Sequence, residues 1–236
     1  MPAQQRPGAY PQAPVLGILM LQTRFPRPPG DIGHPGTFAF PVRRRIVGGA
    51  TPLRVVRSDD PALLPPFIAA AHELLAEGCA AIATSCGFLA RWQRELQAAL
   101  PVPVWSSSLL QLAAAQAAGR RCGVITIEAA SLGPAHFAGV GADPATPVEG
   151  ITPGSALHRT LLQDLPTLDM ADAQAQVLAA AQRLRAREPA LDTMVLECTN
   201  LPPYAPALRQ AMGLEVLDVV TLLNARMVAL AASGAG

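Results

Sequence analysis

The sequence of 236 residues contains no lysine, and all 18 of its positive charges are arginine. Without lysine, the chain has no Schiff-base nucleophile, no anchor for pyridoxal phosphate and no P-loop lysine for a nucleotide phosphate. Charged residues make up only 15% of the chain and the formal net charge is +1, which is not typical of a nucleic-acid-binding protein. We therefore expect no nucleic-acid partner.

Several sequence patterns are also missing. No run of 18 apolar residues occurs, so we expect no spanning helix and no membrane partner. Neither GxGxxG nor GxSxG is present, which argues against a dinucleotide site and a serine hydrolase. The four cysteines form no CxxC pair and no spacing typical of a zinc site, so we expect free thiols, no metal and a cytoplasmic location.

The front of the chain differs from the rest in apolarity and in charge. Residues 1–14 contain no apolar segment, which predicts a disordered tail rather than a signal peptide. Residues 1–57 hold eight arginines against one carboxylate, Asp31, whereas the other 179 residues hold ten arginines against sixteen carboxylates. Such a basic segment either steers an anionic substrate or forms a solvated face that balances the rest of the chain. The second interpretation is the simpler one.

Short apolar runs alternate with longer stretches of helical period along the rest of the chain. Strands are predicted at 15–21, 80–84, 102–105, 122–127, 193–197 and 215–219. Helices are predicted at 63–77, 88–100, 108–118, 129–138, 169–187, 204–212 and 221–232. The alternation indicates an α/β protein with parallel sheets, and the continuously apolar strands indicate sheets that are buried on both faces.

Two segments that lie 112 residues apart share one layout. AIATSCGF and MVLECTNL each consist of an apolar strand, a cysteine, small or polar residues and then a helix. This repeat predicts two similar parallel-sheet half-domains in tandem, with one larger doubly wound sheet as the alternative. The segment 22–41 breaks the rhythm with many prolines and glycines. It follows the first strand, at the carboxyl edge where α/β proteins bind ligands.

Cys86 and Cys198 end the strands of these two segments. A turn from strand to helix places each thiol at the ligand edge, and the positive helix N-terminus is expected to lower its pKa. Either cysteine alone is more simply a small buried hydrophobe, but their matching positions favour a functional pair. Cys79 and Cys122 lie at the opposite ends of their strands and are interpreted as structural.

The segments TSCGF around Cys86 and LECTNLPPY around Cys198, together with the opening LGILMLQTRFPRPPGDIGHP, resemble the aspartate/glutamate/hydantoin racemase superfamily. The resemblance covers roughly residues 15 to 232. It implies two similar α/β domains in a pseudo-twofold relation, with the active site in the cleft between them and a last helix that returns to the first domain. The first domain would span 15–112 and 214–236, and the second 113–213. The resemblance also implies a homo-oligomer.

The implied activity is that of a racemase or epimerase without cofactor or metal, acting on an amino acid such as aspartate or glutamate, or on a hydantoin. Cys86 and Cys198 would be the two bases, one as thiolate and one as thiol, at the carbon next to the carboxylate or carbonyl of a small substrate. Asp31 and Glu197 would modulate the thiols. The residues expected to bind the substrate through amide and hydroxyl groups are Thr84, Ser85, Gly87, Ser107, Thr126, Thr199 and Asn200.

Three alternatives stay open at this point. An arylmalonate-type decarboxylase forms a similar carbanion but keeps only the cysteine equivalent to Cys198, so the presence of Cys86 favours two-sided proton transfer. A maleate-type cis–trans isomerase uses two cysteines, one of which attacks the double bond. A small-acid binding protein on the same fold is the non-enzymatic alternative, and the two retained thiols argue against it.

Overall fold

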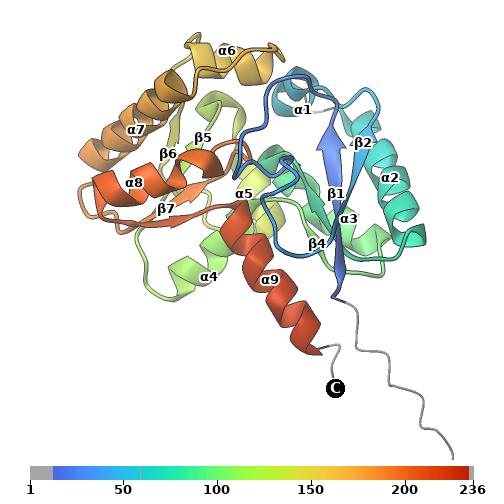
Figure 1. Cartoon of the computed structure of the whole chain (residues 1–236). Helices are drawn as coiled ribbons and strands as arrows, with labels where there is room; N and C mark the ends of the chain where they lie inside the picture. The colour runs from blue at the N-terminus through green and yellow to red at the C-terminus, as the bar shows by residue number, and fades with distance from the viewer. Residues whose placement is uncertain (1–12, 59, 234–236) are drawn as a thin grey trace, which may run out of the picture.

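The structure, a computed structural model, describes residues 13–58 and 60–233. Its strands form two four-stranded parallel sheets with the orders β2-β1-β3-β4 and β6-β5-β7-β8 (Figure 1). The first sheet contains β1 (Val15–Leu21), β2 (Val42–Val47), β3 (Cys79–Thr84) and β4 (Val104–Trp105). The second contains β5 (Cys122–Thr126), β6 (Val148–Gly150), β7 (Thr193–Leu196) and β8 (Glu215–Leu217). The predicted α/β class is confirmed. The alternative prediction of one larger doubly wound sheet is wrong, because the strands form two separate sheets. Most of the predicted tail, 1–14, lies outside the described residues.

Helices connect the strands and cover the sheets. They are α1 (Pro52–Arg57), α2 (Leu64–Ala76), α3 (Gln93–Ala99), α4 (Leu112–Ala117), α5 (Pro134–Val140), α6 (Ala156–Leu162), α7 (Met170–Arg187), α8 (Ala205–Met212) and α9 (Val219–Ser233). The predicted helices at 88–100 and 108–118 begin as tight 3-10 segments, Gly87–Trp92 and Ser108–Gln111. The turn after Cys86 is therefore narrower than an α-helix.

Four elements escape the sequence pattern. The strand β2 has the sequence VRRRIV, and its arginines hide the apolar alternation while they suit a strand at the edge of a sheet. The strand β6 has only three residues, which is too short for a visible period. The helices α1 and α6 have six and seven residues and lie in connections that follow β2 and β6. Both helices turn out to cover the site described below.

The first sheet is buried on both faces, which explains its continuously apolar strands. On one face, Leu19 of β1 belongs to a core that includes Phe67 of α2. On the other face, Ile18 shares a cluster with Leu223 of α9. Figure 1 shows α9 running from the second sheet back to the first. The last helix thus packs against the first sheet, whereas β8 pairs with β7 in the second sheet, although both lie within 214–236, the range predicted for the first domain.

Candidate active site

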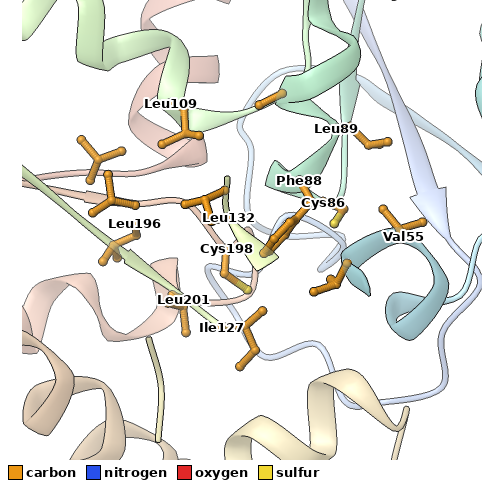
Figure 2. Close-up of a cluster of buried hydrophobic side chains, with 14 of the residues drawn as sticks. Val55, Cys86, Phe88, Leu89, Leu109, Ile127, Leu132, Leu196, Cys198 and Leu201 are labelled. Atoms are coloured by element: carbon orange, nitrogen blue, oxygen red, sulfur yellow. The ribbon is translucent and has the colours of Figure 1, made fainter. Parts of the chain in front are cut away.

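The strands β3 and β7 hold equivalent places in the two sheets, and each is followed within two residues by a cysteine. Cys86 and Cys198 line one cavity between the two halves of the chain. Figure 2 shows both side chains within one cluster of buried apolar side chains that includes Phe88 and Ile127. Cys79 and Cys122 instead begin β3 and β5, at the opposite edges of the sheets. The fold therefore separates the two pairs of thiols as predicted.

Most of the cavity wall is apolar. Its apolar lining consists of Leu21, Phe25, Pro52, Val56, Phe88, Ile127, Leu161 and Leu162. Its remaining lining consists of Arg27, Ser85, Cys86, Gly87, Cys198, Thr199 and Asn200. The space open to the centre of a water molecule is about 30 Å³, which suits only a few waters. The cavity is therefore narrow, and a substrate needs the wall to move before it fits.

Burial controls the acidity of both thiols. Desolvation raises the pKa of Cys86, the negative charge of Glu197 raises it further, and the Phe88 N–H and Arg27 oppose this. Burial and Glu197 likewise raise the pKa of Cys198 well above its ordinary value, against the Asn200 N–H. The predicted lowering of these pKa values is wrong, because burial raises both. Neither cysteine begins an α-helix, and desolvation outweighs one backbone donor.

The predicted substrate-binding residues separate into two groups. Ser85, Gly87, Thr199 and Asn200 line the cavity. The remaining three are engaged elsewhere and do not line it. The hydroxyl of Thr84 donates to the Ser106 carbonyl (2.6 Å), that of Thr126 donates to Glu197 Oε2 (2.6 Å), and that of Ser107 accepts from the Leu109 N–H (3.2 Å). All three residues are fully buried, and their hydroxyls bond to other groups of the chain.

Two hydrogen bonds tie the cysteine turns to each other and to the loop after β1. The Thr199 hydroxyl donates to the Ser85 carbonyl over 2.6 Å, although 114 residues separate them. Asn200 Nδ2 donates to Asp31 Oδ2 (2.7 Å), and Asn200 Oδ1 faces the Cys198 thiol at 3.6 Å. The predicted modulator Asp31 thus reaches Cys198 through an amide. Substrate binding by Thr199 through its hydroxyl would first break its bond to Ser85.

Arg27 is the site residue that sequence analysis did not single out. Its Nη1 donates to Asp31 Oδ1 (2.9 Å), its Nη2 donates to Thr23 Oγ1 (2.9 Å), and its guanidinium lies over the Phe25 ring at 4.7 Å from the centroid. The loop 22–41 at the carboxyl edge of β1 was the available signal. Other arginines of the basic segment 1–57 pair at the surface, such as Arg43 with Glu77, and fit the simpler interpretation of a solvated face.

Glu197, the second predicted modulator, is completely buried. Its Oε2 accepts the Thr126 hydroxyl, whereas its Oε1 has no hydrogen-bond partner. Desolvation raises the pKa of Glu197 to about 8, against the stabilising Thr126 hydrogen bond. The residue does not line the cavity and lies behind the turn of Cys86, as its contact with Gly87 shows.

The helices α1 and α6 form the roof of the cavity. Pro52 and Val56 come from α1, and Leu161 and Leu162 come from α6. Figure 1 shows the two helices side by side at the top of the molecule, where they contact each other. Two clamps that cross between the halves hold this roof. Arg57 Nε donates to Glu128 Oε2 at 2.9 Å, and the Phe25 N–H donates to Asp164 Oδ1 at 3.1 Å.

Within 13–58 and 60–233, no three histidine, cysteine, aspartate or glutamate side chains are grouped so as to hold a metal ion. None of the helices in the described part of the chain combines the length and apolarity that crossing a bilayer requires.

The chain is similar in sequence to proteins of a known family. Residues 51–227 match the family described as Asp/Glu/Hydantoin racemase. The chain is 30% identical to dimethylsulfoniopropionate lyase 7 of Emiliania huxleyi (strain CCMP1516), over 92% of this chain and 67% of that protein. It is 28% identical to lyase 5 of the same organism, over 89% of this chain and 44% of that protein. The chain thus spans about half to two thirds of the length of these relatives.

Solved structures with low sequence identity share the fold. Unliganded arylmalonate decarboxylase matches with a TM-score of 0.61 at 16% identity, over 92% of each chain. Picrophilus torridus aspartate racemase matches with a TM-score of 0.59 at 11% identity, over 93% of this chain and 94% of that one. These two likenesses concern the arrangement of strands and helices alone.

Proposed function

The chain belongs to the Asp/Glu/hydantoin racemase family, and from this premise we propose that it removes a proton from the carbon next to a carboxylate with a cysteine thiolate. The observation that carries the proposal is the meeting of Cys86 and Cys198, from equivalent strands of two sheets, in one narrow and mostly apolar cavity. A site that admits little water strengthens every charge interaction with a developing carbanion.

Cys86 is the better base of the two thiols. Arg27 favours the Cys86 thiolate, which partly offsets the effects of burial and of Glu197. Around Cys198, by contrast, both Glu197 and Asp31 disfavour a negative sulfur. We therefore assign Cys86 as the thiolate that takes the proton and Cys198 as the neutral thiol across the cavity.

The lining favours an acid without an α-ammonium group. Among the described residues, no aspartate or glutamate lines the cavity. The nearby Asp31 carboxylate already accepts from Arg27, the Gly33 N–H and Asn200, so it has little capacity for a substrate cation. A free amino acid would leave its ammonium group unpaired, which is costly in a buried site. A small carboxylic acid with an apolar or weakly hydrated substituent fits better than aspartate or glutamate.

The lyase names of the relatives support β-elimination as the outcome for such an acid, with dimethylsulfoniopropionate as the first substrate to test. The Cys86 thiolate takes the α-proton, and the electron pair of the C–H bond forms the carbon–carbon double bond. The bond from the β-carbon to sulfur breaks, and its electron pair leaves on sulfur as neutral dimethyl sulfide. Acrylate remains, and the Cys86 proton returns to solvent. Phe88 in the lining adds an aromatic ring that suits a sulfonium cation, whereas the Phe25 ring already has Arg27 over it.

Racemisation is the second candidate, and the second thiol favours it. Elimination and decarboxylation need one cysteine, whereas racemisation needs a proton donor on the opposite face of the carbanion. Cys198 occupies the equivalent turn of the other half and supplies that donor. The two outcomes share the first step and differ in whether the substrate carries a leaving group on its β-carbon.

Proton NMR in heavy water separates these outcomes. The protein is incubated with dimethylsulfoniopropionate, an enantiopure 2-arylpropionate, a 5-substituted hydantoin and an arylmalonate. Acrylate formation supports the lyase, α-deuteration with loss of optical rotation supports the racemase, and carbon dioxide release supports the decarboxylase. Cys122→Ala is the matched control and should behave like the wild type. No reaction and no α-exchange with any of the four would contradict the proposed function.

A further inference from the structure

Glu197 is a buried acid whose position the proposed chemistry has not yet used. It precedes Cys198 in the chain, yet its carboxyl group packs against the turn that carries Cys86. A methyl group added to Gly87 would lie 2.3 Å from Glu197 Oε1 and 2.2 Å from its carbonyl oxygen. The absence of a side chain at Gly87 therefore makes room for this carboxyl group. One acid thus lies between the turns of both cysteines.

The carboxyl group is also poorly solvated by the protein. The side chain is fully buried, its Oε1 has no hydrogen-bond partner and its Oε2 accepts a single hydroxyl, that of Thr126. A charged carboxylate usually gathers several donors when buried. The sparse partners of Glu197 suit a neutral carboxylic acid.

We propose that Glu197 is a positioning residue that works as a neutral acid, so that its ionisation at alkaline pH suppresses thiolate formation on Cys86. The proposal rests on the proposed function only in taking the Cys86 thiolate as the working base. A carboxylate beside a thiolate in a dry site places two like charges together, and each disfavours the other. A neutral Glu197 removes that repulsion without removing the side chain that fills the space beside Gly87.

The other charged and titratable groups around Glu197 do not account for a change of charge in this pH range. Cys86 and Cys198 are the groups whose charge Glu197 opposes directly. Arg27 and Asp31 form an ion pair at 2.9 Å, in which Arg27 favours the Cys86 thiolate and Asp31 disfavours that of Cys198. Burial keeps Tyr204 neutral, with its pKa raised to about 12. Glu197 is therefore the group whose charge state changes near neutral to mildly alkaline pH, because its own pKa lies at about 8.

Site-resolved alkylation of Cys86 by iodoacetamide tests the proposal without any substrate. The rate is measured by mass spectrometry from about pH 6.5 to about pH 9.5 in the wild type, in Glu197→Gln and in Glu95→Gln, whose carboxylate is exposed on α3. We expect the ratio of the Glu197→Gln rate to the wild-type rate to rise from about 1 at the acid end to about tenfold at the alkaline end, since one pKa unit of like-charge repulsion corresponds to tenfold. Glu95→Gln should keep a ratio near 1 throughout.

A ratio that stays constant with pH would overturn the proposal, because a residue that merely fills space changes reactivity equally at every pH. Should Glu197→Gln fail to fold, infrared spectra of wild-type protein with isotopically labelled glutamate decide the matter. We expect one protonated carboxyl band to persist above about pH 6 and to vanish through about pH 8. A spectrum in which every glutamate is ionised by about pH 6 would overturn the proposal. Neither measurement depends on which substrate is turned over, so failure of the proposed function is seen separately.

Discussion

The two halves of the molecule share a backbone plan but carry different charges at equivalent positions. The Ser85 N–H donates to the Leu19 carbonyl and the Glu197 N–H donates to the Ile125 carbonyl, each over 2.9 Å, directly before the two cysteines. At this position the first half has a neutral hydroxyl and the second half has a buried acid. The comparison teaches that a repeated strand and turn can supply two thiols to one cavity without giving them the same acidity.

The loops that follow the first strand of each half also carry different charged residues. The loop after β1 brings Arg27 and Asp31 to the site, so it supplies a cation close to Cys86. The segment after β5 supplies Glu128, which forms an ion pair with Arg57 of the first half. His158 Nε2 lies 3.4 Å from Glu128 Oε1. Under the proposed function, the first loop would therefore tune the thiols, while the second contributes to the contacts across the roof. The halves thus differ in the charges that they place near the thiols and in their contacts at the roof.

The largest expected effect comes from removing either thiol of the pair. Cys86→Ala should lower both elimination and racemisation by about a thousandfold or more, because the base is lost. Cys198→Ala should abolish racemisation to the same degree but should reduce elimination less, because elimination uses one base. Substrate turnover followed by NMR measures both. Cys79→Ala and Cys122→Ala are the matched controls at the amino ends of β3 and β5, and full activity in Cys86→Ala would end the assignment of roles.

The charge difference between Ser85 and Glu197 should appear in the pH dependence of stability. The folded state raises the pKa of Glu197 from 4.5 to about 8, so the folded protein binds one more proton than the unfolded chain between these values. The resulting stability is fully present below about pH 4.5 and is lost as pH rises to about 8. Relative to Glu197→Gln, the wild type should lose about 3 kcal/mol of unfolding free energy between pH 5 and pH 8.

Urea unfolding of the two proteins at both pH values measures this difference. Ser85→Ala should show the same change with pH as the wild type, because the hydroxyl does not titrate in this range. A wild type and a Glu197→Gln variant whose stabilities run in parallel from pH 5 to pH 8 would mean that Glu197 is ionised in the folded protein throughout.

Removing the Arg27 cation should make the reactivities of the Cys86 and Cys198 thiols more alike. Arg27→Gln should slow alkylation of Cys86 at pH 8 by about tenfold and that of Cys198 by less, since Arg27 favours the Cys86 thiolate. The change also leaves the buried Asp31 without its partner, which destabilises the fold. The double variant Arg27→Gln with Asp31→Asn restores neutrality and should keep the slower Cys86 reaction. Equal slowing of both cysteines would argue against this division of roles.

The smallest effect is expected from the surface clamp between the halves. Arg57→Gln removes the arginine that joins α1 to Glu128, so amides of α6 should exchange with deuterium about two- to fivefold faster, as suits an exposed ion pair. Arg54→Gln is the control, because Arg54 pairs with Asp60 inside the first half. Unchanged exchange in α6 for Arg57→Gln would show that apolar packing alone holds the roof.

Much of the fold was accessible to sequence reasoning because its signals are local. Apolar strands, glycines after helices and cysteines at strand ends repeat along the chain, so the two halves and the pairing of Cys86 with Cys198 could be predicted. The edge strand β2 could not, since its arginines hide the pattern, and the short β6, α1 and α6 gave too little of one. Thr84 and Thr126 end β3 and β5 and Ser107 lies two residues beyond β4, but their hydroxyls bond to the chain and the residues do not line the cavity.

The sequence by itself determined the α/β class, the repeat of strand and cysteine, the places of Cys86 and Cys198 after strands and of Cys79 and Cys122 at strand starts, and the absence of lysine. Only the tertiary structure decided the acidity of those thiols and which residues surround them. Asp31, the partner of Arg27, meets Asn200 across 169 residues of chain, and Glu197 meets Gly87 across 110. Desolvation and charge act through space, so a pKa depends on neighbours that residue order does not reveal.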